Sequence, residues 1–122
     1  MIKTIKDLQI YKISYNLAME IYKITKTFPK EEEEVYSLTD QIRRSSRSIP
    51  ANIAEGWAKR KYENVFIKYL NDAMGSCEEV KVWLDFAKDC NYINNNTHEK
   101  FYEKYNQIGA MLFSLIKKWK KF

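Results

Sequence analysis

The feature of this sequence that most constrains its fold is the recurrence of apolar residues at alternating steps of three and four. This spacing places the apolar side chains on one face of an α-helix. The pattern occurs in four segments, over residues 10–28, 35–57, 66–87 and 101–119. With only 3 Gly and 2 Pro in 122 residues, the chain has too few turn-forming residues for a β-sandwich or a barrel. The sequence therefore predicts an all-α protein with four long helices.

The predicted helices are similar in length and are joined by short links. Together with the turns that flank each apolar stripe, helices of roughly 22 to 28 residues are expected, about 33 to 42 Å long at 1.5 Å per residue. Matching lengths favour an antiparallel, up-down-up-down four-helix bundle, with residues 1–122 as a single domain. Pro29 is expected to end the first helix, and residues 94–97 to cap the last. The second helix has two candidate starts, the acidic run at 31–34 and a capping-box sequence at 37–40.

Helical bundles often hold metal centres, but this sequence lacks the ligands for one. A di-iron site needs inward carboxylates and Glu-x-x-His on two helices, whereas the single histidine, His98, follows Asn95 by three residues. We expect His98 to be an exposed residue of a first helical turn, and Cys77 and Cys90 to be reduced core residues. Haem, zinc and nucleophile–base chemistry also lack a second partner. The sequence thus predicts no enzymatic activity, no catalytic residue, no metal and no cofactor.

No segment predicts an association with a membrane. The longest apolar stretch, residues 109–116 with one serine inside it, is far too short to span a bilayer. The first six residues do not have the pattern of a secretory signal. We therefore expect the protein to be cytoplasmic.

Residues 41–56 depart from a regular helical sequence. Pro50 falls inside the second helical pattern, where proline removes an amide donor and clashes with the carbonyl of Ser46, at a cost of about 3 kcal/mol. A kink is expected here. Short polar side chains nearby can bond to freed backbone groups, so we favour a repaired kink over a binding site. These side chains are Ser45, Ser46, Ser48 and Asn52.

The opposite face of the same helix combines arginine with small residues. Helical spacing from Ile42 places on it Arg43, Arg47, Ala51, Ala54 and Ala58. Small residues beside arginine permit the close approach of another surface, so this face is a candidate subunit interface. The alternative is that alanine serves only as a good helix former. Two glycines inside other helices, Gly75 and Gly109, similarly suggest tight helix crossings.

The net charge of +5 is unevenly distributed along the chain. Residues 1–30 and residues 96–122 each carry six basic and two acidic side chains, while residues 62–95 carry three basic and six acidic ones. The first and last helices of an up-down-up-down bundle are neighbours, so one basic flank is predicted. A second basic cluster, Lys59-Arg60-Lys61, follows the second helix. Some lysines have a simpler role, because those at 117–121 complement the negative end of a helix.

Several motifs together resemble those of one known family. They lie at residues 7–11, 28–29, 38–45, 48–56, 75–76 and 78–79. The longest reads Ser-Ile-Pro-Ala-Asn-Ile-Ala-Glu-Gly, from Ser48 to Gly56. Over nearly its whole length the chain resembles the four-helix-bundle proteins encoded in bacterial ribosomal RNA intervening sequences. It departs from them at Ser45 and Ser46, where the family more usually has alanines.

The resemblance implies an antiparallel bundle without enzymatic activity, assembled as a homopentameric ring and associated with nucleic acid. Relatives of the family include the accessory protein of diversity-generating retroelements, a basic pentamer that engages a reverse transcriptase and its RNA. The residues that match the family motif or the candidate interface are Arg43, Arg44, Arg47, Ser48, Pro50, Ala51, Asn52, Ala54, Glu55, Gly56 and Ala58.

Charge and resemblance together favour a non-enzymatic, oligomeric bacterial protein that binds RNA or DNA, with RNA favoured, through phosphate contacts without base readout. The alternative is a protein-interaction scaffold or accessory subunit, such as a partner of a reverse transcriptase, whose basic surface meets an acidic protein. The expected nucleic-acid contacts are Lys12, Lys23, Lys26, Lys59, Arg60, Lys61, Lys117 and Lys118.

Overall fold

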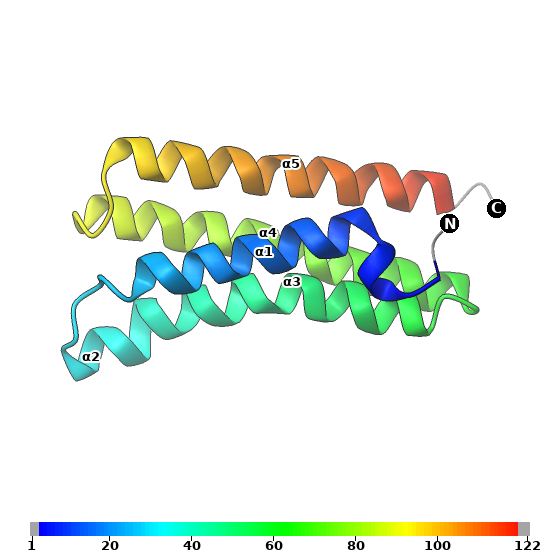
Figure 1. The fold of residues 1–122 in the computed structure, drawn as a ribbon, viewed down its shortest axis with the longest axis horizontal. Coiled ribbons are helices and arrows are strands. Elements are labelled where there is room, and N and C mark those ends of the chain that lie inside the picture. The colour runs from blue at the N-terminus through cyan, green and yellow to red at the C-terminus, as the bar shows by residue number, and fades with distance from the viewer. Residues whose placement is uncertain (1–2, 120–122) are drawn as a thin grey trace.

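The computed structural model describes residues 3–119, and four long helices make up most of them. They are α1 (Gln9–Thr25), α3 (Asp40–Ala58), α4 (Glu63–Asp89) and α5 (Asn95–Trp119). Three short elements complete the fold: η1 (Ile5–Asp7), α2 (Glu32–Glu34) and η2 (Val35–Thr39). Successive long helices run in opposite directions, with α1 beginning at the end of the bundle where α5 finishes (Figure 1). The predicted all-α, four-helix bundle is confirmed.

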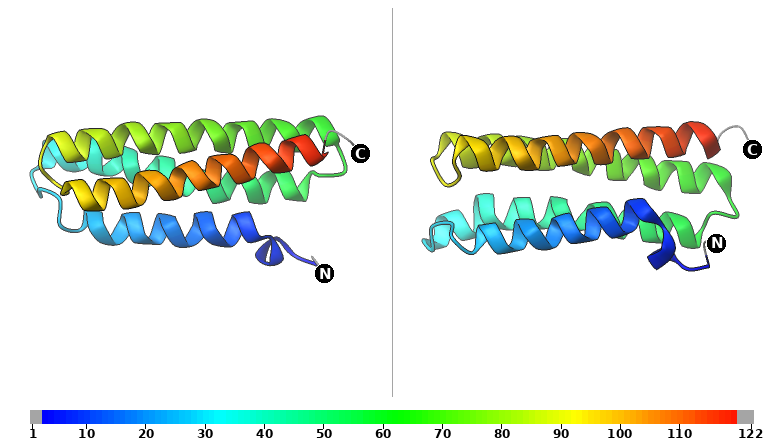
Figure 2. Two further views of the ribbon diagram at one scale, coloured as in Figure 1. Left: turned by 90° about the horizontal axis from the view of Figure 1, so that it is seen from above. Right: turned by 45° about the horizontal axis from the view of Figure 1, so that its top comes forward.

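The helices form a closed square. Helix α1 packs on α3, α3 on α4 and α4 on α5, while α5 returns to α1 in a looser contact. In the right view of Figure 2, α1 lies beside α3 and α4 lies beside α5. The predicted adjacency of the first and last helices is therefore confirmed. Each long helix buries apolar side chains completely, as Ile21, Ile49, Leu84 and Leu112 illustrate.

The second long segment begins in its acidic run. Helix α2 starts at Glu32, and the chain continues through the π-helical turns of η2 into α3 without leaving the helix. The start at residues 31–34 is thus confirmed and the capping-box start at 37–40 is wrong. Three glutamates in the first turn complement the positive end of the helix, which explains the earlier start.

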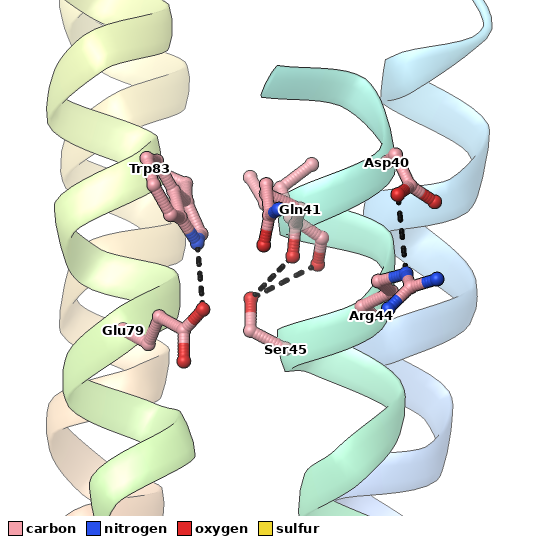
Figure 3. A network of polar contacts seen from close by, with 7 residues as sticks. Asp40, Gln41, Arg44, Ser45, Glu79 and Trp83 are labelled. Atoms are coloured by element: carbon pink, nitrogen blue, oxygen red, sulfur yellow. Dashed lines mark hydrogen bonds and ion pairs between the residues drawn. The ribbon is translucent and has the colours of Figure 1, made fainter. Parts of the chain in front are cut away.

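Helix α3 remains continuous through Pro50, which is buried. Three serines before it donate their hydroxyl hydrogens to backbone carbonyls, as expected. These carbonyls lie one turn back along the helix, and none of them is the Ser46 carbonyl, which faces the proline and lacks its usual N–H donor. The acceptors are the carbonyls of Gln41 and Ile42 for Ser45, of Arg43 for Ser46 and of Ser45 for Ser48. Figure 3 shows the Ser45 hydroxyl directed back toward the Gln41 carbonyl, on the side of α3 that faces α4.

The tight helix contact occurs at a different glycine from those predicted. A Cβ added at Gly56 would lie 2.8 Å from Tyr69 Cβ and 3.1 Å from Phe66 Cδ1, both on α4. A Cβ added at Gly75 or Gly109 would meet nothing within 4 Å. The prediction of tight helix crossings at these two glycines is therefore wrong, because no neighbouring helix of the bundle lies close to either. Gly56 is the position where the absence of a side chain lets α3 and α4 approach.

Two further expectations for single residues are wrong. His98 is buried rather than exposed, because its Nε2 lies 2.7 Å from Asp85 Oδ1 on α4 and its ring lies against Tyr102. Cys90 is exposed at the end of α4, whereas Cys77 fills the core as expected. Both errors arise where a helix terminus meets a neighbouring element, which helical spacing does not describe.

Candidate nucleic-acid interface

Six of the eight predicted nucleic-acid contacts lie toward one end of the bundle. At this end α1 begins, α3 gives way to α4, and α5 finishes (Figure 1). All six side chains are exposed. We refer to them together as the basic end, which consists of Lys12, Lys59, Arg60, Lys61, Lys117 and Lys118.

The other two predicted contacts lie near the opposite end. Lys23 belongs to the last turn of α1 and Lys26 follows it. Lys23 follows Lys12 by eleven positions, which corresponds to roughly 16 Å along the helix axis. The predicted single flank along the first and last helices is therefore divided between the two ends. Lys120 and Lys121 lie outside the described residues.

An aromatic cluster holds the helices together beneath the basic end. The ring centroids of Phe66 and Trp119 are 4.6 Å apart in an edge-to-face arrangement, and those of Trp57 and Trp119 are 6.4 Å apart. Such pairs add about 0.5 to 1.5 kcal/mol beyond the burial of their area. The cluster joins the last turn of α5 to the end of α3 and the start of α4. It thereby fixes Lys117 and Lys118 near the α3–α4 link.

Each of the three cations in the α3–α4 link lies over an aromatic ring. Arg60 Cζ is 4.1 Å from the centroid of Trp57, Lys59 Nζ is 5.1 Å from that of Tyr69, and Lys61 Nζ is 5.9 Å from that of Tyr62. Cation–π contacts of this kind hold a positive group in place without neutralising it. Sequence reasoning missed the three rings, although the interleaving of aromatic and basic residues over 57–69 is a signal that could have found them.

No residue of the basic end forms an ion pair within the described residues. The ion pairs found between residues 3 and 119 lie elsewhere and join Arg44 to Asp40, Lys68 to Asp72, Lys81 to Glu78, His98 to Asp85 and Lys104 to Glu20. Lys59 Nζ donates to Tyr69 Oη at 3.2 Å, and this hydrogen bond raises the pKa of Lys59 above its ordinary value. Lys59 is therefore fully charged at neutral pH.

Asp7 is an acidic residue near the start of α1. Its carboxylate accepts hydrogen bonds from the backbone N–H groups of Thr4 and Lys3, at 3.0 and 2.9 Å. These bonds, that from Thr4 foremost, lower the pKa of Asp7. The carboxylate thus fixes the turn before α1.

A second cationic cluster surrounds Tyr22, nearer the other end. Lys26 Nζ and Arg43 Cζ each lie 4.8 Å from the ring centroid of Tyr22, and Arg47 Cζ lies 5.6 Å from it. Arg43 Nε also donates to the buried Thr25 Oγ1 at 2.8 Å. The structure therefore brings Lys26 together with two motif arginines of α3, rather than with the basic end.

Beside this cluster, an apolar groove of about 330 Å³ runs between α1 and α3. Exposed Tyr15 and Met19 form part of its α1 side. The α3 side contains four residues of the candidate interface, namely Arg47, Pro50, Ala51 and Ala54. Ala58 is also exposed, so the predicted outer face of this helix does face away from the core.

The remaining motif residues divide between the inside and the outside of the bundle. Gly56 and Pro50 are buried, and Ser48 Oγ, whose hydrogen is donated to the Ser45 carbonyl, accepts a hydrogen bond from Ser76 Oγ of α4 at 2.6 Å. Asn52 is half-buried, while Glu55 is exposed. Arg44 is also exposed and pairs with Asp40 at 3.1 Å, on the side of α3 away from Glu79 and Trp83 (Figure 3). The inner residues of the motif thus support the α3–α4 contact.

The described residues contain neither a cluster of metal ligands nor a membrane-spanning helix. Between residues 3 and 119, no three His, Cys, Asp or Glu side chains are grouped so that they could hold a metal ion. No helix in this part of the chain combines the length and apolar character needed to cross a membrane.

Comparison with known proteins identifies the family. The sequence profile of the 23S rRNA-intervening sequence protein matches residues 6–114. A solved structure of an S23 ribosomal-protein-family protein of unknown function, from Bacteroides thetaiotaomicron, superposes with a TM-score of 0.79 at 30% sequence identity, covering 88% of this chain and 98% of that chain. The comparison with curated proteins found no match. As its motifs indicated, this chain belongs to the 23S rRNA-intervening sequence protein family.

Proposed function

We propose that this protein is a non-enzymatic RNA-binding protein of the cytoplasm that contacts RNA phosphates through the basic end. The observation that carries the proposal is the convergence of six exposed cations at one end of the bundle, with no ion pair to any of them in the described residues. The family name associates relatives of this chain with ribosomal RNA genes, which favours RNA over DNA.

The chemistry of the basic end suits a phosphate backbone. Lysine and arginine side chains that neutralise phosphates release condensed counterions, which supplies most of the affinity in binding without base readout. The rings under Lys59, Arg60 and Lys61 keep these charges at the surface. The alternative is a scaffold whose basic surface binds an acidic protein. A measurement of RNA affinity distinguishes this alternative from RNA binding.

Charge reversal at the basic end tests this proposal. The triple variant Lys59→Glu/Arg60→Glu/Lys61→Glu should bind a structured RNA at least roughly 100-fold more weakly at low salt, because three phosphate contacts become repulsive. The control, Lys23→Glu/Lys30→Glu/Lys100→Glu, makes the same change in net charge at exposed positions toward the opposite end of the bundle and leaves the cations around Tyr22 in place. It should retain affinity within a few-fold. Equal weakening by both variants, or no RNA binding by the wild type, would contradict the proposal.

We also propose that the chain forms a homo-oligomer through the apolar groove between α1 and α3, a pentamer being the state that the family resemblance implies. Tyr15 and Met19 are 49% and 43% exposed there, beside the alanines of α3. Exposed apolar patches mark protein interfaces, in which aromatic residues, methionine and arginine such as Tyr15, Met19 and Arg47 are enriched. The cations around Tyr22 would then meet acidic groups of the neighbouring subunit.

Light scattering at micromolar concentration tests the oligomer. We expect a mass several times that of the 14.6 kDa chain, and a smaller mass for Ala51→Arg, because the added side chain would occupy the groove. Asn71→Arg, on the exposed surface of α4, should leave the helical content unchanged and serves as the folding control. A monomeric wild type would rule out the assembly.

A further inference from the structure

We infer that the basic end recognises unpaired nucleotides, with a base stacked on the ring of Tyr62 while the neighbouring cations hold its phosphates. This inference rests on the proposed RNA binding and specifies which form of RNA the site takes. It depends on the arrangement of one exposed aromatic ring within the α3–α4 link.

Tyr62 has a fixed backbone and a free ring. Its N–H donates to the Lys59 carbonyl at 2.9 Å, and its own carbonyl accepts from the N–H groups of Val65 and Phe66 at 3.1 and 3.0 Å. The residue therefore serves as the N-cap of α4. Its side chain is nevertheless 62% exposed. A large ring that is mostly exposed, on a backbone held in place by hydrogen bonds, is suited to stacking on a ligand.

The cations next to Tyr62 are arranged to accompany a stacked base. Lys61 Nζ lies 5.9 Å from the Tyr62 ring, and Arg60 lies over Trp57 with its Nη1 donating to the Trp57 carbonyl at 2.9 Å. Both cations are exposed. A nucleotide is the ligand that combines a flat aromatic face with an anion about one side-chain length away. In the α3–α4 link, the Tyr62 ring would take the base, and Arg60 and Lys61 would take the phosphate.

Unpaired nucleotides satisfy this arrangement better than a duplex does. The bases of a duplex are stacked on one another, so their faces are not available to a protein ring, whereas bases in loops, bulges and single strands can be. Stacking on aromatic side chains tolerates any base, because every base has a flat face. We therefore expect a preference for single-stranded RNA with little dependence on sequence.

The test compares single-stranded RNA with a duplex of the same length and salt concentration, by fluorescence anisotropy. The wild type should bind the single strand more tightly. Tyr62→Ala should lower that affinity by roughly fivefold to a hundredfold while changing duplex binding little, and Tyr62→Phe should restore it. Tyr36→Ala is the matched control, because Tyr36 is 71% exposed and lies in η2, beside the acidic run. Circular dichroism confirms that each variant is folded.

Three results would overturn the inference. The first is equal binding of single strand and duplex, and the second is unchanged affinity in Tyr62→Ala. If in either case the triple reversal of Lys59, Arg60 and Lys61 still abolishes binding, the proposed phosphate contacts stand and only the stacking role fails. The third is the absence of RNA binding by the wild type, which removes the proposed function and this inference together.

Discussion

Gly56 illustrates how one residue can set the distance between two helices. It lies near the end of α3, where Tyr69 and Phe66 of α4 occupy the space that a side chain would need. The atom nearest to an added methyl group is Tyr69 Cβ, which is attached directly to the α4 backbone and cannot rotate away. Gly75 and Gly109 have open space instead. A side chain is therefore excluded at Gly56 but has room at Gly75 and Gly109.

Substitution of these glycines should separate the two situations. Gly56→Ala should destabilise the protein by about 1 to 3 kcal/mol, because the methyl group forces α3 and α4 apart. Gly75→Ala should stabilise it by about 0.5 to 1 kcal/mol, because alanine is the better helix former where space is open. Urea unfolding followed by circular dichroism measures both. Equal effects of the two substitutions would show that the α3–α4 contact is not close at Gly56.

The two cysteines should differ sharply in reactivity. Burial raises the pKa of the Cys77 thiol to about 12, whereas Cys90 is exposed at the end of α4. The thiolate is the reactive form, so Cys77 stays protonated and unreactive from pH 7 to pH 9. A thiol-reactive chromophore should therefore label one cysteine in the folded protein, none in Cys90→Ser, and two in the unfolded wild type. Rapid labelling of folded Cys90→Ser would contradict the packing around Cys77.

At the scale of elements, the sequence predicted the helices well and their ends less well. Apolar spacing reports which face of a helix is buried, so the positions of Ile42, Ile49 and Ile53 followed from the pattern. Apolar spacing contains no information about which residue of a neighbouring helix lies opposite a given side chain. The burial of His98 depends on Asp85, thirteen residues earlier on α4, and is therefore invisible to spacing. The same applies to the contact at Gly56.

The candidate site shows the same division. Segment charges pointed to the basic segments and to the α3–α4 link, but the assignment of lysines to one flank ignored their positions along the helices. Lys12 and Lys23 belong to the same basic segment and lie on different halves of α1. Lys12 lies near the start of α1, at the end of the bundle where α5 finishes with Lys117 and Lys118, whereas Lys23 lies in the last turn of α1. The rings under the link cations were missed, although the interleaved aromatic and basic residues over 57–69 are a sequence signal for them.

For the whole molecule, the up-down-up-down topology gathers basic residues from three parts of the chain at one end. The start of α1, the link between α3 and α4, and the end of α5 meet there (Figure 1). Helix α4 and its C-terminal link, within residues 62–95, carry three basic and six acidic side chains. This uneven distribution of charge is the basis of the proposed RNA binding. An oligomer would repeat the basic end and increase the avidity for one long RNA.

The salt dependence of RNA binding tests this account most directly. Each phosphate contact contributes a slope of about −0.7 to a plot of log affinity against log salt for a single strand. Six contacts predict a fall of roughly 300-fold between 50 and 200 mM salt. The triple variant Lys59→Glu/Arg60→Glu/Lys61→Glu should show a slope smaller in magnitude by about 2. An affinity that does not change with salt, or the same slope in both proteins, would contradict phosphate binding at the basic end.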